Sequence, residues 1–227
     1  MPEHHLVAPI SAFVTKCMKD YDPSHNPTHI NRVVNLALRI LKSEQAQSPK
    51  PIDKLTVHLA ALLHDISDRK YLSKDSRQAA NAIPPHKLVE HILLTHGADP
   101  ALAQRVQIIV SHVSYTTECK DPLAVKRLIE GGYVELAIVQ DADRLDALGA
   151  VGIGRCFTFL GAKGRDMLKD EEEWEMENSI RHFGEKLEKL EGMMKTETGR
   201  KMARVRTERL VEFRRWWEEE IEDVSSA

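Results

Sequence analysis

Four side chains of metal-binding type lie in three separate parts of the sequence: His29, then the adjacent pair His64 and Asp65, then Asp143. Two imidazoles and two carboxylates form a mixed nitrogen and oxygen ligand set. Such a set suits Mn, Fe, Co, Ni or Zn better than Ca, whose sites are built from oxygen alone. Because a bound cation of this kind polarises a phosphoryl oxygen and activates water, the set indicates hydrolysis of a phosphate ester or anhydride.

His29 lies on an apolar helical face. Val33 and Ile40 follow it at helical spacing, after a helix-start signal at Asn26 and Pro27. Its imidazole is therefore expected to point into the core with them rather than into bulk water. Taken alone, the pattern also fits a buried histidine that serves only as a hydrogen-bonding partner.

His64 and Asp65 close a second apolar helix, which we expect over 53–65 with Asp53 as its N-cap. Adjacent residues on a helix diverge by about 100 degrees, so both can reach one ion only near the helix end. The pair therefore predicts a metal at the end of this helix.

Asp143 emerges from an apolar segment that would ordinarily exclude a carboxylate. With Asp141 and Asp146 it would form a strongly self-repelling group inside a dry core. A divalent cation together with Arg144 relieves that repulsion. A salt bridge from Asp143 to Arg32 or Arg144 is the alternative.

Further polar residues lie beside these ligands in the sequence. Asp68 follows His64 by four residues and is a candidate general acid or base, or else a surface residue at a helix end. Four basic residues are candidates for binding phosphate oxygens: Arg32, Arg69, Lys70 and Arg144.

Composition limits the class of protein. The 227 residues, 42% hydrophobic and 30% charged, contain no long biased stretch, so we expect one large folded unit. A net charge of -3 without a basic run argues against a nucleic-acid polymer as partner but leaves a small anionic substrate open. Three cysteines without a CxxC spacing and no signal segment predict an intracellular, cytoplasmic protein, with the nucleus not excluded. The apolar runs are too short for a membrane span.

The hydrophobic periodicity is helical almost everywhere, and we find no alternating strand pattern with a hairpin turn, so the predicted fold class is all-α. Beyond the helices that carry His29 and His64, we expect helices over 76–81, 86–95, 100–112 and 133–150. The polar segment 115–122 lacks helical periodicity and is predicted to be a loop.

The C-terminal part carries two apolar stripes typical of long amphipathic helices. Spacings of four and three separate the apolar residues over 176–194, and a second stripe runs over 202–221 after a break at 196–199. We expect a helical core over 1–170 and a helical hairpin over 171–227 that packs on the core within the same unit. An oligomer contact is the alternative use of the stripes, which leaves a homodimer open.

Three of these segments resemble the H…HD…D signature of the HD superfamily of metal-dependent phosphohydrolases. They match its order and separation: His29-Ile-Asn-Arg32-Val33, Leu63-His64-Asp65-Ile-Ser-Asp68-Arg-Lys70 and Gln140-Asp-Ala-Asp143-Arg144-Leu145-Asp146-Ala147. Segments 149–157 and 182–200 resemble a narrower subgroup, which contains bacterial nucleoside triphosphate pyrophosphohydrolases and microbial and fungal relatives. The resemblance covers about 25–213. Asn26 departs from it, since many HD proteins carry an aspartate there, and this bears on substrate detail.

The resemblance implies an HD-domain helical bundle with one divalent metal ion, manganese first and Ni, Co, Fe, Zn or Mg as alternatives. It implies as metal ligands His29, His64, Asp65 and Asp143. The predicted catalytic residues are Asp68, Asp65 and Lys70. The predicted substrate-binding residues are Arg32, Lys70, Arg144 and His112, with a second metal as the alternative role of His112. Asp141 is read as structural.

The predicted reaction is hydrolysis of a nucleotide, namely a nucleoside or deoxynucleoside triphosphate to the monophosphate and pyrophosphate. The expected partner is therefore a small-molecule phosphate ester or nucleotide. Alternatives on the same scaffold are a 5′-nucleotidase-type phosphomonoesterase, a di-iron oxygenase and a non-catalytic nucleotide-binding HD protein.

Overall fold

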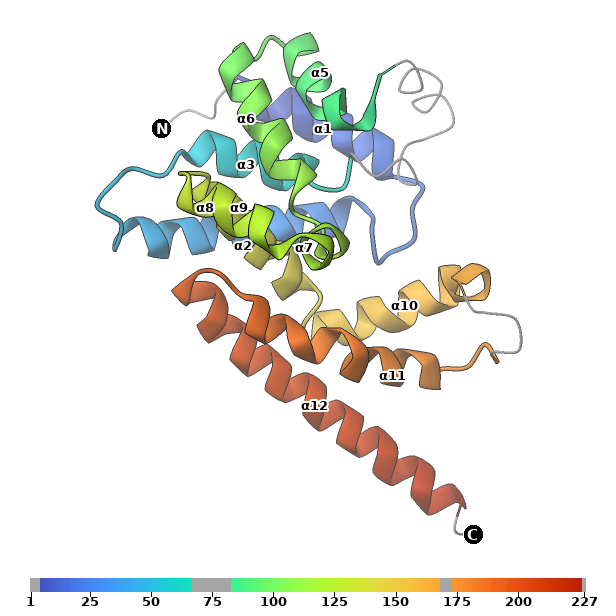
Figure 1. Cartoon of the computed structure of the whole chain (residues 1–227). Helices are drawn as coiled ribbons and strands as arrows, with labels where there is room; N and C mark the ends of the chain where they lie inside the picture. The colour runs from blue at the N-terminus through green and yellow to red at the C-terminus, as the bar shows by residue number, and fades with distance from the viewer. Residues whose placement is uncertain (1–4, 67–82, 168–172, 226–227) are drawn as a thin grey trace.

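The computed structural model describes residues 5–66, 83–167 and 173–225. Every regular element in this described part is a helix (Figure 1), which confirms the all-α prediction. The helices are α1 (Val7–Met18), α2 (Pro27–Gln45), α3 (Lys54–Leu63), η2 (Pro85–Lys87), α5 (Leu88–Thr95), α6 (Pro100–Ser111), α7 (Tyr115–Lys120), α8 (Pro122–Glu130), α9 (Val134–Asp146), α10 (Gly149–Met167), α11 (Glu177–Glu185), η3 (Leu187–Met193) and α12 (Glu197–Ser225). The helix predicted over 76–81 lies outside the described residues.

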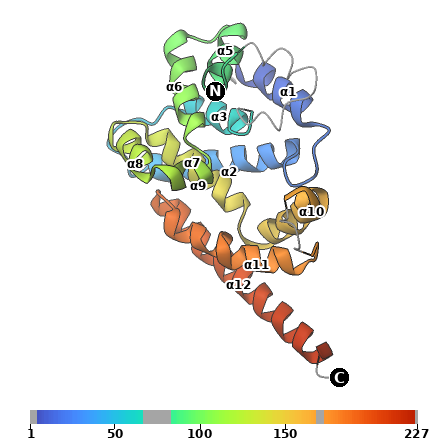
Figure 2. The same ribbon diagram turned by 45° about the vertical axis from the view of Figure 1, so that its right-hand side comes forward.

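Helices α2 and α9 form the centre of the molecule. Both pack against α3, while α5 and α6 pack together and α6 also contacts α3. Helices α10 to α12 form a second layer on one side of this bundle, with α12 contacting α9 and α2 (Figure 2). The central helices therefore lie between the two layers and can present side chains to the space where the layers meet.

Two N-caps determine where the predicted ligands fall. The Oδ1 of Asn26 accepts hydrogen bonds from the backbone N–H groups of Thr28 and His29, and Pro27 fills the first turn of α2. The carboxylate of Asp53 accepts from the second and third residues of α3 in the same way, as predicted. Helix α3 then ends at Leu63, so His64 and Asp65 stand at the helix end.

Two predicted elements of the core were wrong. Segment 115–122 is not a loop, because α7 and the start of α8 fill it and tertiary contacts of Glu118 stabilise the short helix. The helix predicted over 133–150 breaks after Asp146, and α10 starts at Gly149, which adopts a φ of 69° that favours glycine. Helices α9 and α10 reach the length and composition of a membrane span only as a pair bent by 71°, and no single helix among the described residues does.

The C-terminal hairpin is present, but its first arm is not one long helix. Helix α11 ends at Glu185 and the chain continues as the 3-10 helix η3, since Gly184 and Gly192 weaken a continuous α-helix there. The later part of the stripe is buried as expected, whereas Met176 is 59% exposed. In α12, Leu210 is buried but Val205 and Ile221 of the predicted apolar side are exposed.

A buried ion network ties the hairpin to the core. Glu118 pairs with Arg144 of α9 and with Lys195, which lies in the segment before α12. The Nζ of Lys195 is 2.7 Å from the Glu118 carboxylate. Asp141 accepts hydrogen bonds from the backbone N–H groups of Lys195 and Thr196. Asp141 thus has the structural position that we predicted, away from the ligands.

Lowering the pH should weaken the fold through Glu118. Burial alone would raise the pKa of its carboxyl, but the hydrogen bonds and charges of Lys195 and Arg144 outweigh burial and lower it below 4.5. A carboxyl with a lowered folded-state pKa contributes stability above its unfolded pKa, and this contribution is lost as the pH falls through the folded pKa. We expect the free energy of unfolding to decline below about pH 4.5 in urea titrations, and to decline less in Glu118→Gln. Equal slopes in both proteins would contradict this role.

Candidate metal centre

The four predicted ligand side chains meet between α2, the end of α3 and α9. His29 Nε2 lies 3.3 Å from His64 Nε2 and 3.3 Å from Asp65 Oδ2. His64 Nε2 lies 3.5 Å from Asp65 Oδ2, and Asp143 Oδ1 lies 3.9 and 3.7 Å from the two histidine nitrogens. Two ligand atoms that each lie about 2.0–2.2 Å from one ion are about 3–4 Å from each other. Each of the two carboxylates therefore lies close to both histidine nitrogens.

The hydrogen bonds of both imidazoles turn the same nitrogen toward these carboxylates. His64 Nδ1 donates to the carbonyl oxygen of Ala61 at 2.8 Å, and His29 Nδ1 donates to Asp146 Oδ2 at 2.8 Å. The Nε2 atom of each ring is therefore the nitrogen available to a cation. This is the usual way in which an outer hydrogen bond orients a metal-binding histidine.

The residues fit a divalent cation by two further observations. Asp65 Oδ2 is buried and has no hydrogen-bond partner, although a buried carboxylate oxygen is costly without one. The ligand atoms of His29, His64 and Asp143 also lie within 4.8 Å of one another.

Asp146 supports the centre through its hydrogen bond to His29. It is 1% exposed, and besides His29 it accepts two hydrogen bonds from Arg32, at 2.7 and 2.9 Å, while Arg155 lies 3.1 Å away. Burial would raise the pKa of Asp146, but the hydrogen bonds of His29 and Arg32 and the charge of Arg155 hold it well below its usual range. Asp146 thus stays ionised, and its hydrogen bond fixes the orientation of the His29 ring.

A pocket of about 580 Å³ opens beside the cluster. Its lining includes His64, Asp65 and Asp143 together with basic side chains from α10, from α11 and from the residue that follows α11. The basic side chains are Arg155, His182 and Lys186. Five residues with hydroxyl groups also line the pocket: Ser111, Ser114, Tyr115, Thr116 and Thr117. This volume lies within the range of about 300–1,000 Å³ that is usual for small-molecule pockets.

His25 also lines this pocket, close to the cluster. Its ring lies edge-on to His29 and to Phe159, with centroids 5.8 and 5.4 Å away. Its Nδ1 is 2.7 Å from the hydroxyl of Ser24, so a contact with a substrate would use Nε2. Burial lowers the pKa of His25 to about 4.

Comparisons with known proteins match nearly the whole chain. The protein YpgQ of Bacillus subtilis is 34% identical over 229 residues, which cover 100% of this chain and 98% of YpgQ. The crystal structure of YpgQ in complex with ADP has a TM-score of 0.69 at 32% identity and covers 95% of this chain and 97% of its own. A crystal structure of an HD-superfamily hydrolase from Bacillus thuringiensis has a TM-score of 0.65 at 29% identity, with coverage of 95% and 96%. No family model matches the chain.

The chain belongs to the HD superfamily. The expected resemblance is therefore confirmed, and the protein is a metal-dependent hydrolase of the phosphohydrolase class. A group of histidine and aspartate side chains that can bind the metal is present in the described residues of this HD protein.

The HD protein uses some predicted substrate-binding residues differently. Arg144 is 3% exposed, and its guanidinium donates to Glu118 and to the carbonyl oxygen of Met193 instead of lining the pocket. Arg32 is engaged by Asp146, and His112 Nδ1 donates to the carbonyl oxygen of Ile108 at 2.8 Å. Neither Arg32 nor His112 is among the described residues that line the pocket. Asp68 and Lys70 lie outside the described residues.

Sequence reasoning missed the residues that support and face the cluster. Asp146 follows Asp143 by three residues, which places both on one face of α9, so helical spacing could have indicated its role. Arg155, His182 and Lys186 lie in the segments 149–157 and 182–200 that carry the subgroup resemblance, but their approach to the pocket depends on how α10 and α11 pack on the core.

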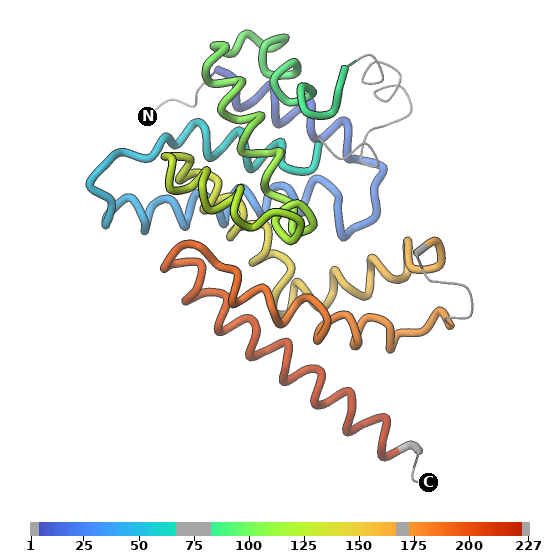
Figure 3. The backbone as a smooth tube through the Cα atoms, viewed as in Figure 1, coloured from blue at the N-terminus to red at the C-terminus, as the bar shows by residue number. Residues whose placement is uncertain are grey.

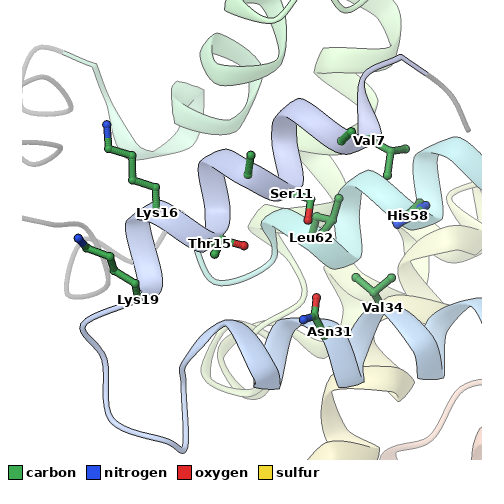
Figure 4. A pocket seen from close by; sticks show the side chains of 11 residues that line it. Val7, Ser11, Thr15, Lys16, Lys19, Asn31, Val34, His58 and Leu62 are labelled. Atoms are coloured by element: carbon green, nitrogen blue, oxygen red, sulfur yellow. The ribbon is translucent and has the colours of Figure 1, made fainter.

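A second hollow, between α1, α2 and α3, lacks the means to bind this metal (Figure 4). It has a volume of about 670 Å³, and it is lined by Lys16 of α1, by Lys19 just after α1 and by His58 of α3. The described residues around it include no carboxylate. Among the described residues, this hollow therefore offers a metal ion one imidazole, that of His58.

Proposed function

We propose that the protein hydrolyses a nucleoside or deoxynucleoside triphosphate to the monophosphate and pyrophosphate. The observation that carries this proposal is the pocket, whose lining combines three residues of the metal-ligand cluster with basic and hydroxyl-bearing residues. A polyphosphate bound in it is proposed to contact the ligand cluster through one phosphate and a basic side chain through another. The ADP in the YpgQ crystal structure supports a nucleotide over other phosphate esters.

The proposed metal ligands are His29, His64, Asp65 and Asp143. Manganese is our first choice among divalent cations, with Co, Ni, Fe, Zn and Mg as alternatives. When bound, the cation supplies Lewis acidity toward a phosphoryl oxygen and toward the attacking water. Asp146 keeps His29 oriented, and the carboxylates of Asp65 and Asp143 supply the negative charge that holds the cation.

The remaining side chains of the pocket position the substrate. Lys186, which follows α11, and Arg155 of α10, which also contacts Asp146, are proposed to contact phosphate oxygens through their charges. Burial lowers the pKa of His182, so this residue is proposed to act as a neutral hydrogen-bond donor. His25 is proposed to contact the reacting phosphate or its water through Nε2. Asp68 as acid or base and Lys70 as a phosphate contact stay predictions.

The test is a product assay on metal-stripped protein that has been reloaded with Mn. A panel of ribonucleoside and deoxyribonucleoside tri-, di- and monophosphates is incubated with it, and pyrophosphate and orthophosphate are measured separately. We expect pyrophosphate and a nucleoside monophosphate from at least one triphosphate. Orthophosphate from monophosphates would instead show a 5′-nucleotidase, and binding without turnover under every metal would show a non-catalytic nucleotide-binding protein.

Replacing Lys186 with alanine should raise the KM for the triphosphate about tenfold or more, because a hydrogen bond to a charged group contributes about 1.5–3 kcal/mol. The Nζ of Lys186 lies 4.8 Å from the centre of the Tyr115 ring at the pocket wall. The matched control is Lys189→Ala, since Lys189 is exposed and lies outside the pocket. Steady-state kinetics check this, and an equal KM in both variants would remove Lys186 from the substrate site.

A further inference from the structure

Helix α12 carries a second face besides the one that packs on the core. Its C-terminal turns extend beyond α10 and α11 (Figure 3). Val205, Arg209, Glu212 and Trp216 follow each other at spacings of four, three and four, which places them on one stripe of the helix. Val205 is 47% and Trp216 49% exposed. The stripe is thus an exposed face that includes two large apolar side chains.

This stripe lies along an apolar groove. The groove has a volume of about 520 Å³ and runs between α10 and α12. Its lining residues are Ala150, Ile153, Val205, Glu208, Arg209, Glu212, Phe213 and Trp216. A tryptophan is a large apolar side chain that favours a buried pocket at an interface. Trp216 of one copy can therefore pack against the groove of a second copy, and the reverse contact forms at the same time.

The charges of α12 are divided along its length. Residues 200–215 include seven arginines and lysines and two glutamates, whereas 218–223 include five acidic residues and no basic one. An antiparallel pair of these helices would place the acidic end of each against the basic part of the other. A parallel pair would instead place the two acidic ends together, which is repulsive.

We propose that two copies of this chain associate through antiparallel α12 helices about a two-fold axis between Arg209 and Glu212. In this register Arg209 of each copy lies opposite Glu212 of the other, and Val205 lies opposite Trp216. Lys201 similarly lies opposite Glu220. A two-fold interface repeats every contact, so the stripe is complementary to itself. The protruding end of each α12 then lies along the groove beside α10 of the other copy.

In one copy, Glu212 pairs with Arg215 at 3.0 Å on the helix surface. Exposed pairs of this kind are weak and are easily exchanged for a pair across the interface. Burial of Trp216 provides the main attraction, and the charges select the antiparallel direction. The association should therefore weaken at high salt, which screens the charges.

Sedimentation equilibrium on the full-length protein and charge-reversed variants tests the proposal. We expect a dimer for the wild type, a dissociation constant raised about tenfold or more by Arg209→Glu and by Glu212→Arg, and recovery in the double variant Arg209→Glu/Glu212→Arg. Trp216→Ala should also weaken the dimer. Arg204→Glu is the control, because it changes the charge equally on the same helix but off the stripe.

Circular dichroism and thermal unfolding establish that each variant is folded before its mass is measured. A wild-type protein that stays monomeric at all concentrations would overturn the proposal. A dimer that neither single variant weakens, or that the double variant fails to recover, would overturn it as well.

Discussion

Replacing Asp65 with alanine is expected to abolish nucleotide hydrolysis and to weaken divalent-metal binding strongly. Asp65 Oδ2 lies 3.3 and 3.5 Å from the Nε2 atoms of His29 and His64, and it is buried without a hydrogen-bond partner. Lewis-acid assistance contributes several kcal/mol to phosphate hydrolysis, so its loss should lower kcat/KM about a thousandfold or more. Metal titration by calorimetry and the pyrophosphate assay measure both effects on the same preparation.

The matched control for Asp65 is Asp53→Ala, because Asp53 caps the other end of the same helix α3. Losing this N-cap should cost about 1 kcal/mol of stability and leave metal affinity unchanged. Should Asp65→Ala retain metal binding and activity while folded, the proposed ligand set is wrong.

Replacing Asp146 should weaken both the metal centre and the fold. The carboxylate of Asp146 contacts His29, Arg32 and Arg155 while almost fully buried. Losing an outer partner of a metal-binding histidine lowers metal affinity about 10–100-fold. Removing one member of a buried ion pair costs about 3–5 kcal/mol, because the partner charge is left uncompensated. Calorimetric metal titration and urea unfolding of Asp146→Asn and Asp146→Ala check these values.

Asp141→Asn is the control for Asp146, since Asp141 is also buried on α9 but contacts the backbone of Lys195 and Thr196. We expect it to lose stability without losing metal affinity. If the Asp141 and Asp146 variants lose equal metal affinity, general loosening of α9 explains the result and the orienting role of Asp146 fails.

Local patterns were sufficient to predict the helices that bring the ligands together. The apolar spacing after His29 predicted that its ring turns inward, and His29 is 1% exposed. The cap at Asp53 and the apolar run that follows predicted the end of α3, and hence the position of His64 and Asp65. These features depend on residues close in sequence, so periodicity and capping rules suffice to find them.

Features that depend on distant contacts could not be predicted in the same way. Helix α7 has polar residues without periodicity, and Glu118 stabilises it through Arg144 and Lys195, which come from distant parts of the chain. Arg144 looked available for phosphate because only its neighbours in sequence were known. The basic part of the pocket lining similarly depends on how α10 and α11 pack on the core.

The most direct test of the central claim is anomalous X-ray scattering from crystals of the protein loaded with Mn, recorded on both sides of the Mn absorption edge. We expect one anomalous peak per chain, in contact with His29 Nε2, His64 Nε2 and carboxylate oxygens of Asp65 and Asp143. The absence of a peak among these four side chains, with manganese bound elsewhere or not at all, would contradict the proposed metal centre.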